Sequence, residues 1–160
     1  MKKSSKGFSL IELLIVVAII LIIAAIAIPN LLRSRIAANQ ASAVGSLRTL
    51  NTAEITYSST YNVGFTSALS YLAPPTGTGN PTSTAAGLID SVLAGGSKSG
   101  YSFLYTPGAA DATTRINTYA ITATPISDST GTNYYYTDQS GVIRQNSTTT
   151  AASTDSPIAG

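Results

Sequence analysis

Sixteen consecutive apolar residues, 13–28, constrain this 160-residue chain more than any other feature. Counted from Phe8, the apolar segment has 21 residues. As a helix it would span about 31 Å, close to the roughly 30 Å of a bilayer's hydrocarbon core. Nothing else in the sequence is large enough to bury such a helix in a soluble domain. The segment therefore predicts a membrane anchor, a secretory signal, or a helix that packs against other copies of itself.

Charge is distributed unevenly around this segment. Three lysines lie within residues 1–7, and Glu12 is the only ionisable side chain in residues 8–29. The lysines favour a cytoplasmic N-terminus. A carboxylate at the centre of a membrane helix costs about 2.5–3.5 kcal/mol, so it is rare without a partner. Neither a secretory signal cut after Ala27 nor a plain single-span anchor has a use for Glu12.

The sequence KGFSLIELLIVVAII, residues 6–20, resembles the class III signal of the type IV pilin superfamily. In that family a basic leader ends in Gly, and a membrane-embedded prepilin peptidase cleaves after it and methylates the new N-terminal amine. The resemblance implies a leader of residues 1–7, cleavage between Gly7 and Phe8, and N-methylation of Phe8. It also implies that Glu12 acts in assembly by meeting the N-terminal ammonium of a neighbouring subunit, a pair favoured in a low-dielectric core.

The helix is expected to continue beyond its membrane-length part. Pro29 ends the apolar run, but good helix formers follow it, and a proline inside a helix introduces a kink. Residues 8–29 would be the transmembrane or filament-core half, and residues 30–61 an amphipathic half. The recurring positions of that second half are Ile36, Ala43, Leu50 and Tyr57, with Leu47 and Tyr61 on the same side. In the pilin pattern a proline at this place also bears on assembly.

The amino-acid composition changes after residue 61. Residues 62–100 are rich in Gly, Pro, Ser and Thr, which predicts the αβ-loop of the pilin plan, with a short helix at 86–94. Residues 101–145 alternate as strands and predict an antiparallel meander, and residues 146–160 a polar, mobile C-terminal tail. The expected fold class is α+β and pilin-like: a long N-terminal helix, kinked near Pro29, packed on three or four antiparallel strands.

The amino-acid composition limits the kinds of catalytic and metal-binding sites that the chain can contain. The chain has no His, Cys or Trp, which excludes histidine acid–base catalysis, cysteine nucleophiles, disulfides and Cys/His zinc sites. No cofactor is expected. Major pseudopilins of type II secretion hold calcium in a C-terminal loop, and oxygen ligands of that kind exist here in Asp111, Asp128 and Asp138. The alternative is that these three are ordinary turn aspartates.

The expected function is structural rather than enzymatic. We expect a pilin that starts as a bacterial inner-membrane prepilin and becomes an extracellular type IV pilus-like filament on the cell surface. Its partners would be other copies of itself, the inner membrane, the prepilin peptidase and the pilus assembly machinery. The residues after 61 include three Lys or Arg and five Asp, which gives a net charge of −2, so no nucleic-acid partner is expected.

Three alternatives stay open at this point. A pseudopilin of a type II secretion system would share the same N-terminus but form a periplasmic filament. A secreted enzyme would begin at Ile28, after an ordinary signal. A membrane-tethered binding domain would keep its first helix uncut.

Overall fold

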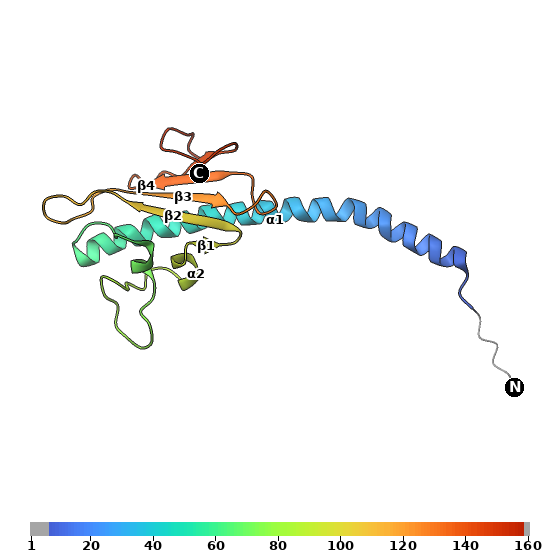
Figure 1. Ribbon diagram of the computed structural model, residues 1–160, viewed down its shortest axis with the longest axis horizontal. Coiled ribbons are helices and arrows are strands. Elements are labelled where there is room, and N and C mark those ends of the chain that lie inside the picture. Colours follow the sequence, from blue (N-terminus) through green and yellow to red (C-terminus); the bar gives the residue numbers. More distant parts are fainter. Residues whose placement is uncertain (1–6, 159–160) are drawn as a thin grey trace. The chain divides into compact units, whose positions relative to one another are not determined.

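The computed structural model describes residues 7–158 and contains one long helix, two short helical turns and five strands (Figure 1). In chain order the elements are α1 (Leu10–Tyr61), the 3-10 turn η1 (Leu69–Leu72), α2 (Ser91–Ala94), β1 (Ser97–Lys98), β2 (Tyr101–Pro107), β3 (Tyr119–Pro125), β4 (Tyr134–Asp138) and β5 (Arg144–Asn146). Contacts divide the chain after Arg35 into two compact units, which are described separately below.

The first unit holds the N-terminal part of α1, and within residues 7–35 every side chain is exposed except that of the half-buried Ala24. The most apolar 18-residue window of α1 has a mean hydropathy of 3.3, and none of it is buried. By length and composition α1 is long and apolar enough to cross a membrane. Pro29 lies inside the helix, which continues on both sides of it. The kink near Pro29 stays a prediction.

The second unit is an antiparallel meander packed on residues 36–61 of α1 (Figure 1). The strand order is β1-β2-β3-β4-β5, with each strand paired to the next along the chain. The α+β fold class is therefore confirmed, with five strands in place of three or four. The additional strand is β1, which has two residues. It pairs with β2 through a tight turn in which Ser99 and Gly100 both have positive φ, as a type I′ hairpin requires.

Periodicity explains how the helix meets the sheet. Positions three and four apart on α1 face the strands, and Ala43, Leu47, Leu50 and Tyr57 are buried there. Along β3 the buried positions alternate, as expected for a strand with one face in a core. The strands contribute Tyr101, Phe103, Tyr119, Ile121, Ala123 and Tyr135 to the same core, and the connection between α1 and β1 contributes Leu69, Leu72, Ala86, Ile89 and Leu93.

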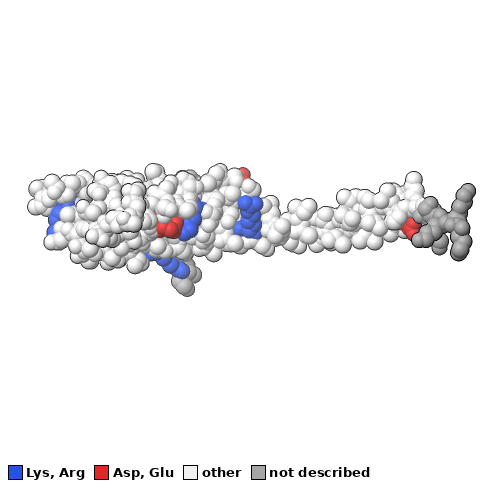
Figure 2. Space-filling model, turned by 90° about the horizontal axis from the view of Figure 1, so that it is seen from below, with Lys and Arg blue, Asp and Glu red and all other residues white. Residues whose placement is uncertain are grey.

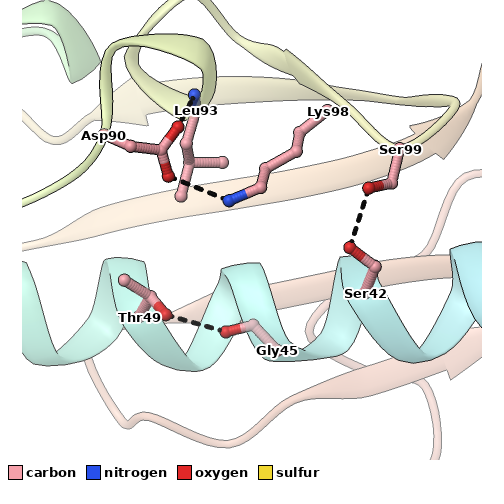
Figure 3. A network of polar contacts seen from close by, with 7 residues as sticks. All are labelled: Ser42, Gly45, Thr49, Asp90, Leu93, Lys98 and Ser99. Atoms are coloured by element: carbon pink, nitrogen blue, oxygen red, sulfur yellow. Dashed lines mark hydrogen bonds and ion pairs between the residues drawn. The ribbon is translucent and has the colours of Figure 1, made fainter.

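The connection between α1 and the sheet is held by local polar contacts (Figure 3). Asp90 caps α2 by accepting a hydrogen bond from the Leu93 amide, and its other oxygen pairs with Lys98 Nζ at 2.9 Å. Ser42 Oγ of α1 donates to Ser99 Oγ at the β1–β2 turn. The helix predicted over residues 86–94 is shorter in the structure, because Gly87 has a positive φ and Asp90 is extended.

The C-terminal segment folds back along β5, whereas the sequence predicts a mobile tail. The Gln145 amide donates to the Ser156 carbonyl at 3.0 Å, and the Ile158 amide donates to the Ile143 carbonyl at 2.9 Å. The Asp155 carboxylate accepts from the Ala152 amide at 2.7 Å and from Asn146 Nδ2 at 3.0 Å. A single carboxylate with two donors organises the turn, which composition alone does not indicate.

Hydroxyl groups on the outer side of α1 are turned back onto the helix. Thr49, Thr52, Thr56 and Ser59 each donate to the carbonyl four residues earlier, at 2.8–3.0 Å. This is the usual way in which a helix accommodates Ser and Thr in its interior positions.

Candidate processing and assembly site

The expected cleavage site lies just outside the first helix. α1 begins at Leu10, so the bond between Gly7 and Phe8 is in non-helical chain. Both residues are exposed, and the Phe8 side chain is 80% accessible. A Cβ added to Gly7 would meet no atom of the described residues within 4 Å, so the described part of the chain does not require glycine there. The leader residues before Gly7, with Lys2, Lys3 and Lys6, lie outside the described residues.

Glu12 has a local partner that the sequence reasoning did not identify. Its Oε2 accepts a hydrogen bond from the Ser9 amide at 2.9 Å, while Ser9 Oγ accepts one from the Ile11 amide at 3.4 Å. This is a variant of the capping box, in which Ser and Glu three residues apart satisfy unpaired amides at a helix N-terminus. The Glu12 carboxylate accepts the Ser9 amide as in that motif, while the Ser9 hydroxyl accepts from Ile11 in place of Glu12. The signal was present in the spacing Ser9-x-x-Glu12. Glu12 therefore has a use within a single chain.

An uncharged surface follows Glu12. From residue 13 to residue 32 there is no Lys, Arg, Asp or Glu, and this stretch is white in Figure 2. The negative charge of Glu12 lies in the first turn of α1, where the helix dipole favours it. A carboxylate at one end of a long apolar cylinder is well placed to bind a cation delivered by another molecule, because the apolar surroundings screen such a pair weakly.

Pro29 contributes to a shallow apolar groove on the first unit. The groove has a volume of about 380 Å³, and it is lined by Leu21, Ala24, Ala25, Ile28 and Pro29. Two alanines separate larger side chains there, which lets another apolar group approach the backbone closely. The groove has the chemistry of a helix-packing surface and no polar group with which to orient a small ligand.

Two of the three calcium candidates, Asp111 and Asp138, accept hydrogen bonds within the chain's own turns. Asp111 Oδ1 accepts from the amides of Thr113 and Arg115, and Oδ2 accepts from Asn117 Nδ2. The Thr113 hydroxyl also donates to this carboxylate. Together these hydrogen bonds hold the pKa of Asp111 well below its ordinary value, and the bond from the Thr113 hydroxyl has the largest effect. Asp138 accepts from the Ser140 amide at 2.9 Å. Asp128 is exposed. Within residues 7–158 no three carboxylates gather into a group that could hold a metal ion.

Comparison with known proteins finds relatives of the N-terminal segment. The family model described as "Prokaryotic N-terminal methylation motif" matches residues 2–28. A "Type IV wide pilus major component PilA4" of Thermus thermophilus is 65% identical over 37 residues, which are 23% of this chain and 28% of that protein. A "Type IV major pilin protein PilA" of Myxococcus xanthus is 52% identical over 50 residues, 31% of this chain and 23% of that protein. No solved structure matches the chain.

These matches span about a quarter of the length of the two curated relatives. The methylation motif, with the apolar helix that it includes, fits an inner-membrane prepilin that then becomes part of a surface pilus. The N-terminal segment of this chain is therefore similar to the N-terminal segments of type IV pilins.

Proposed function

We propose that this chain is the structural subunit of an extracellular type IV pilus-like filament. It is made as an inner-membrane prepilin, is cut between Gly7 and Phe8 by a prepilin peptidase, and is N-methylated on Phe8. The mature subunit polymerises through its N-terminal helix. The chain performs no chemistry of its own and is a substrate of the processing enzyme.

The observation that carries this proposal is the apolar half of α1, whose most apolar window has no buried residue and which lies almost entirely within the match to the methylation motif. Leaving it in water would be costly, at roughly 25 cal/mol for each Å² of apolar surface. A bilayer removes that cost before assembly, and neighbouring helices remove it afterwards. The same segment can therefore serve as membrane anchor and as filament core.

Glu12 supports the same proposal electrostatically. Cleavage after Gly7 would create an ammonium group on Phe8, four residues before Glu12 in the sequence. In a filament of identical subunits the Glu12 carboxylate of one copy would meet the Phe8 ammonium of the next. The pair would compensate two charges that are each costly alone in an apolar core.

Mass spectrometry of the N-terminal peptide tests the proposal, run separately on sheared extracellular material and on membranes. An N-methylated Phe8 in abundant sheared material is the expected result. The same peptide confined to membranes would favour a type II secretion pseudopilin. A start at Ile28, or an intact leader in the final product, would contradict processing after Gly7.

A further inference from the structure

The core of the second unit contains a carboxyl group that the proposed assembly mechanism does not use. Glu54 lies on the buried side of α1, between the core positions Leu50 and Tyr57, and its side chain is completely inaccessible. Its Oε1 lies 2.6 Å from the Thr66 hydroxyl oxygen, and its Oε2 accepts the Thr66 amide hydrogen at 3.0 Å. Both oxygens are thus engaged by one residue of the segment that follows α1.

No cation compensates this carboxyl group in the part of the chain that the structure describes. The one ion pair there joins Lys98 to Asp90 at the surface. The ionisable groups that face Glu54 are Tyr57 of α1, Tyr105 of β2 and Tyr119 of β3. These phenols are neutral at physiological pH, and their own pKa values are raised by burial and then by the Glu54 charge. An ionised Glu54 is therefore compensated only by hydrogen bonds, from the Thr66 hydroxyl and amide and, to a smaller extent, from the Tyr105 hydroxyl.

The contact with Thr66 suits either protonation state. When Glu54 is ionised, the Thr66 hydroxyl and amide both donate to it. When it is neutral, the carboxyl hydrogen can be donated to the Thr66 hydroxyl oxygen, while the amide bond is retained. The hydroxyl only has to rotate. The geometry is therefore kept on protonation, and the unfavourable burial of charge is removed.

Thr66 occupies a junction of the second unit. Its carbonyl accepts a hydrogen bond from the Tyr105 hydroxyl at 2.8 Å, which ties it to β2. The neighbouring Phe65 amide donates to the Ile116 carbonyl at 2.7 Å. Through Thr66, Glu54 fastens the segment of residues 64–69 between α1 and the sheet. A change in the charge of Glu54 acts on this junction directly.

We propose that Glu54 is a proton-operated latch: when its carboxyl group is neutral, its burial carries no charge penalty and residues 64–69 stay in place, and when that group ionises, the opening of these residues, which returns the carboxylate to water, costs less free energy. The latch lies wholly within the second unit and does not depend on how the chain assembles. Burial raises the pKa of Glu54, against the opposing hydrogen bonds from the Thr66 side chain and backbone. A raised pKa means that the folded state holds the proton more tightly than the unfolded state does. The stabilisation that the folded state gains from this proton is complete below the ordinary glutamate pKa and is lost as the pH rises through the folded-state pKa.

The titration can be followed directly, because the chain has only two glutamates, Glu12 and Glu54. We would label the full chain, in detergent micelles, with glutamate carrying ¹³C at the carboxyl carbon. Glu54→Gln assigns one signal by loss, and Glu12→Gln assigns the other independently. The expected result is a Glu54 signal that titrates at higher pH than a free glutamate. Titration at or below the ordinary glutamate pKa would overturn the proposal.

Hydrogen exchange at the Thr66 amide tests whether residues 64–69 open more easily when Glu54 ionises. We expect its protection, corrected for intrinsic exchange, to fall as the pH rises from about 5 to about 8, because the folded state loses the proton of Glu54 over this range. In Glu54→Gln, which imitates the neutral acid, protection should be high and nearly independent of pH. Asp128→Asn removes an exposed carboxylate and should behave as the unaltered chain. Equal pH dependence with and without Glu54 would refute the latch.

A second variant keeps the proposal testable if Glu54→Gln does not fold. Thr66→Val removes the hydroxyl that favours the ionised form and keeps the amide donor. The Glu54 signal should then titrate at a still higher pH. An unchanged titration would show that the Thr66 hydroxyl is not its partner.

Discussion

Glu12 has two possible uses, which operate through different atoms. Within one chain it completes a capping box with Ser9. In a filament it would supply negative charge to the ammonium group of a neighbouring subunit. Capping requires only an acceptor oxygen, whereas the pairing requires the charge, so a neutral amide separates the two.

We expect Glu12→Gln to lose filaments as fully as Glu12→Val. Gln still caps a helix, but it leaves the neighbouring ammonium unpaired, and breaking a buried pair costs about 3–5 kcal/mol. That corresponds to a more than hundredfold weaker contact. The measurement is the yield of sheared filaments by immunoblot against the membrane-bound pool.

The matched control is Ser9→Ala, which removes the capping hydroxyl and keeps the charge. Its cost should be about 0.5–2 kcal/mol of helix stability, with filaments still formed. If Glu12→Gln assembles normally while Ser9→Ala does not, capping is the role of Glu12 and the pairing is wrong.

At the cleavage site we expect Gly7→Leu to block maturation without disturbing the fold. The structure leaves open space for a side chain at this position, so a failure to mature would originate in the peptidase. Mass spectrometry should find the uncut leader in membranes, with Gly7→Ala as the smaller matched change. Normal N-methylated Phe8 from Gly7→Leu would contradict cleavage after residue 7.

At the scale of elements, the sheet was predictable because its pattern is local. Alternation along residues 101–105 and 116–124 predicted the regions of β2 and β3. The expected hairpin of residues 134–137 and 142–144 around a turn at 138–141 corresponds to β4 and the start of β5. β1 was not predicted, because a strand of two residues is too short to show an alternating pattern. The fold of the C-terminal segment was missed because it depends on Asp155 meeting donors from several positions.

The buried polar groups of α1 show the same limit. The seven-residue period correctly predicted Ala43, Leu50 and Tyr57 as core positions. It could not predict that Asn51 and Glu54 would be buried beside them, since their partners come from residues 66, 119 and 137. Only the three-dimensional arrangement brings these donors and acceptors together.

We expect Asn51→Ala to lower the free energy of unfolding of the second unit by about 1–3 kcal/mol. Asn51 donates to the Thr137 hydroxyl and accepts from the Tyr119 hydroxyl, both in the core, and truncation leaves those groups unpaired. Thermal unfolding of the full chain in detergent, followed by the near-UV signal of its tyrosines, measures the effect.

Thr52→Ala, at the neighbouring exposed position, is the control. It removes a hydroxyl that bonds only to its own helix and should change the stability by no more than about 0.5 kcal/mol. Equal losses in both variants would mean that the buried network contributes nothing specific.

At the scale of the whole molecule, the chain is made of two units suited to different surroundings. The first exposes large apolar side chains, while the second has its own core of helix and sheet. We expect residues 36–160 alone to be a soluble monomer, and residues 8–160 to require detergent. Size-exclusion chromatography and circular dichroism compare the two. Aggregation of the shorter chain would show that the second unit needs the first.

The comparisons bear on the first unit far more than on the second, since the family model ends at residue 28. The methylation motif was recognisable in the sequence because a basic leader, Gly, Phe and a spaced Glu must occur together. The details of the second unit depend instead on side-chain packing, which cannot be recognised from a short sequence motif.

The hydroxyls along the outer side of α1 bear on how water meets this surface. The chain contains 21 Ser and 22 Thr, which suggests a strongly hydrated exterior. At positions 49, 52, 56 and 59, however, each hydroxyl hydrogen is already given to a backbone carbonyl. Each of these hydroxyl oxygens can still accept a hydrogen bond from water, but it has no hydrogen left to donate. Beside the exposed Ile55, this strip therefore offers water acceptors without donors, and it is less hydrophilic than its Ser and Thr content suggests.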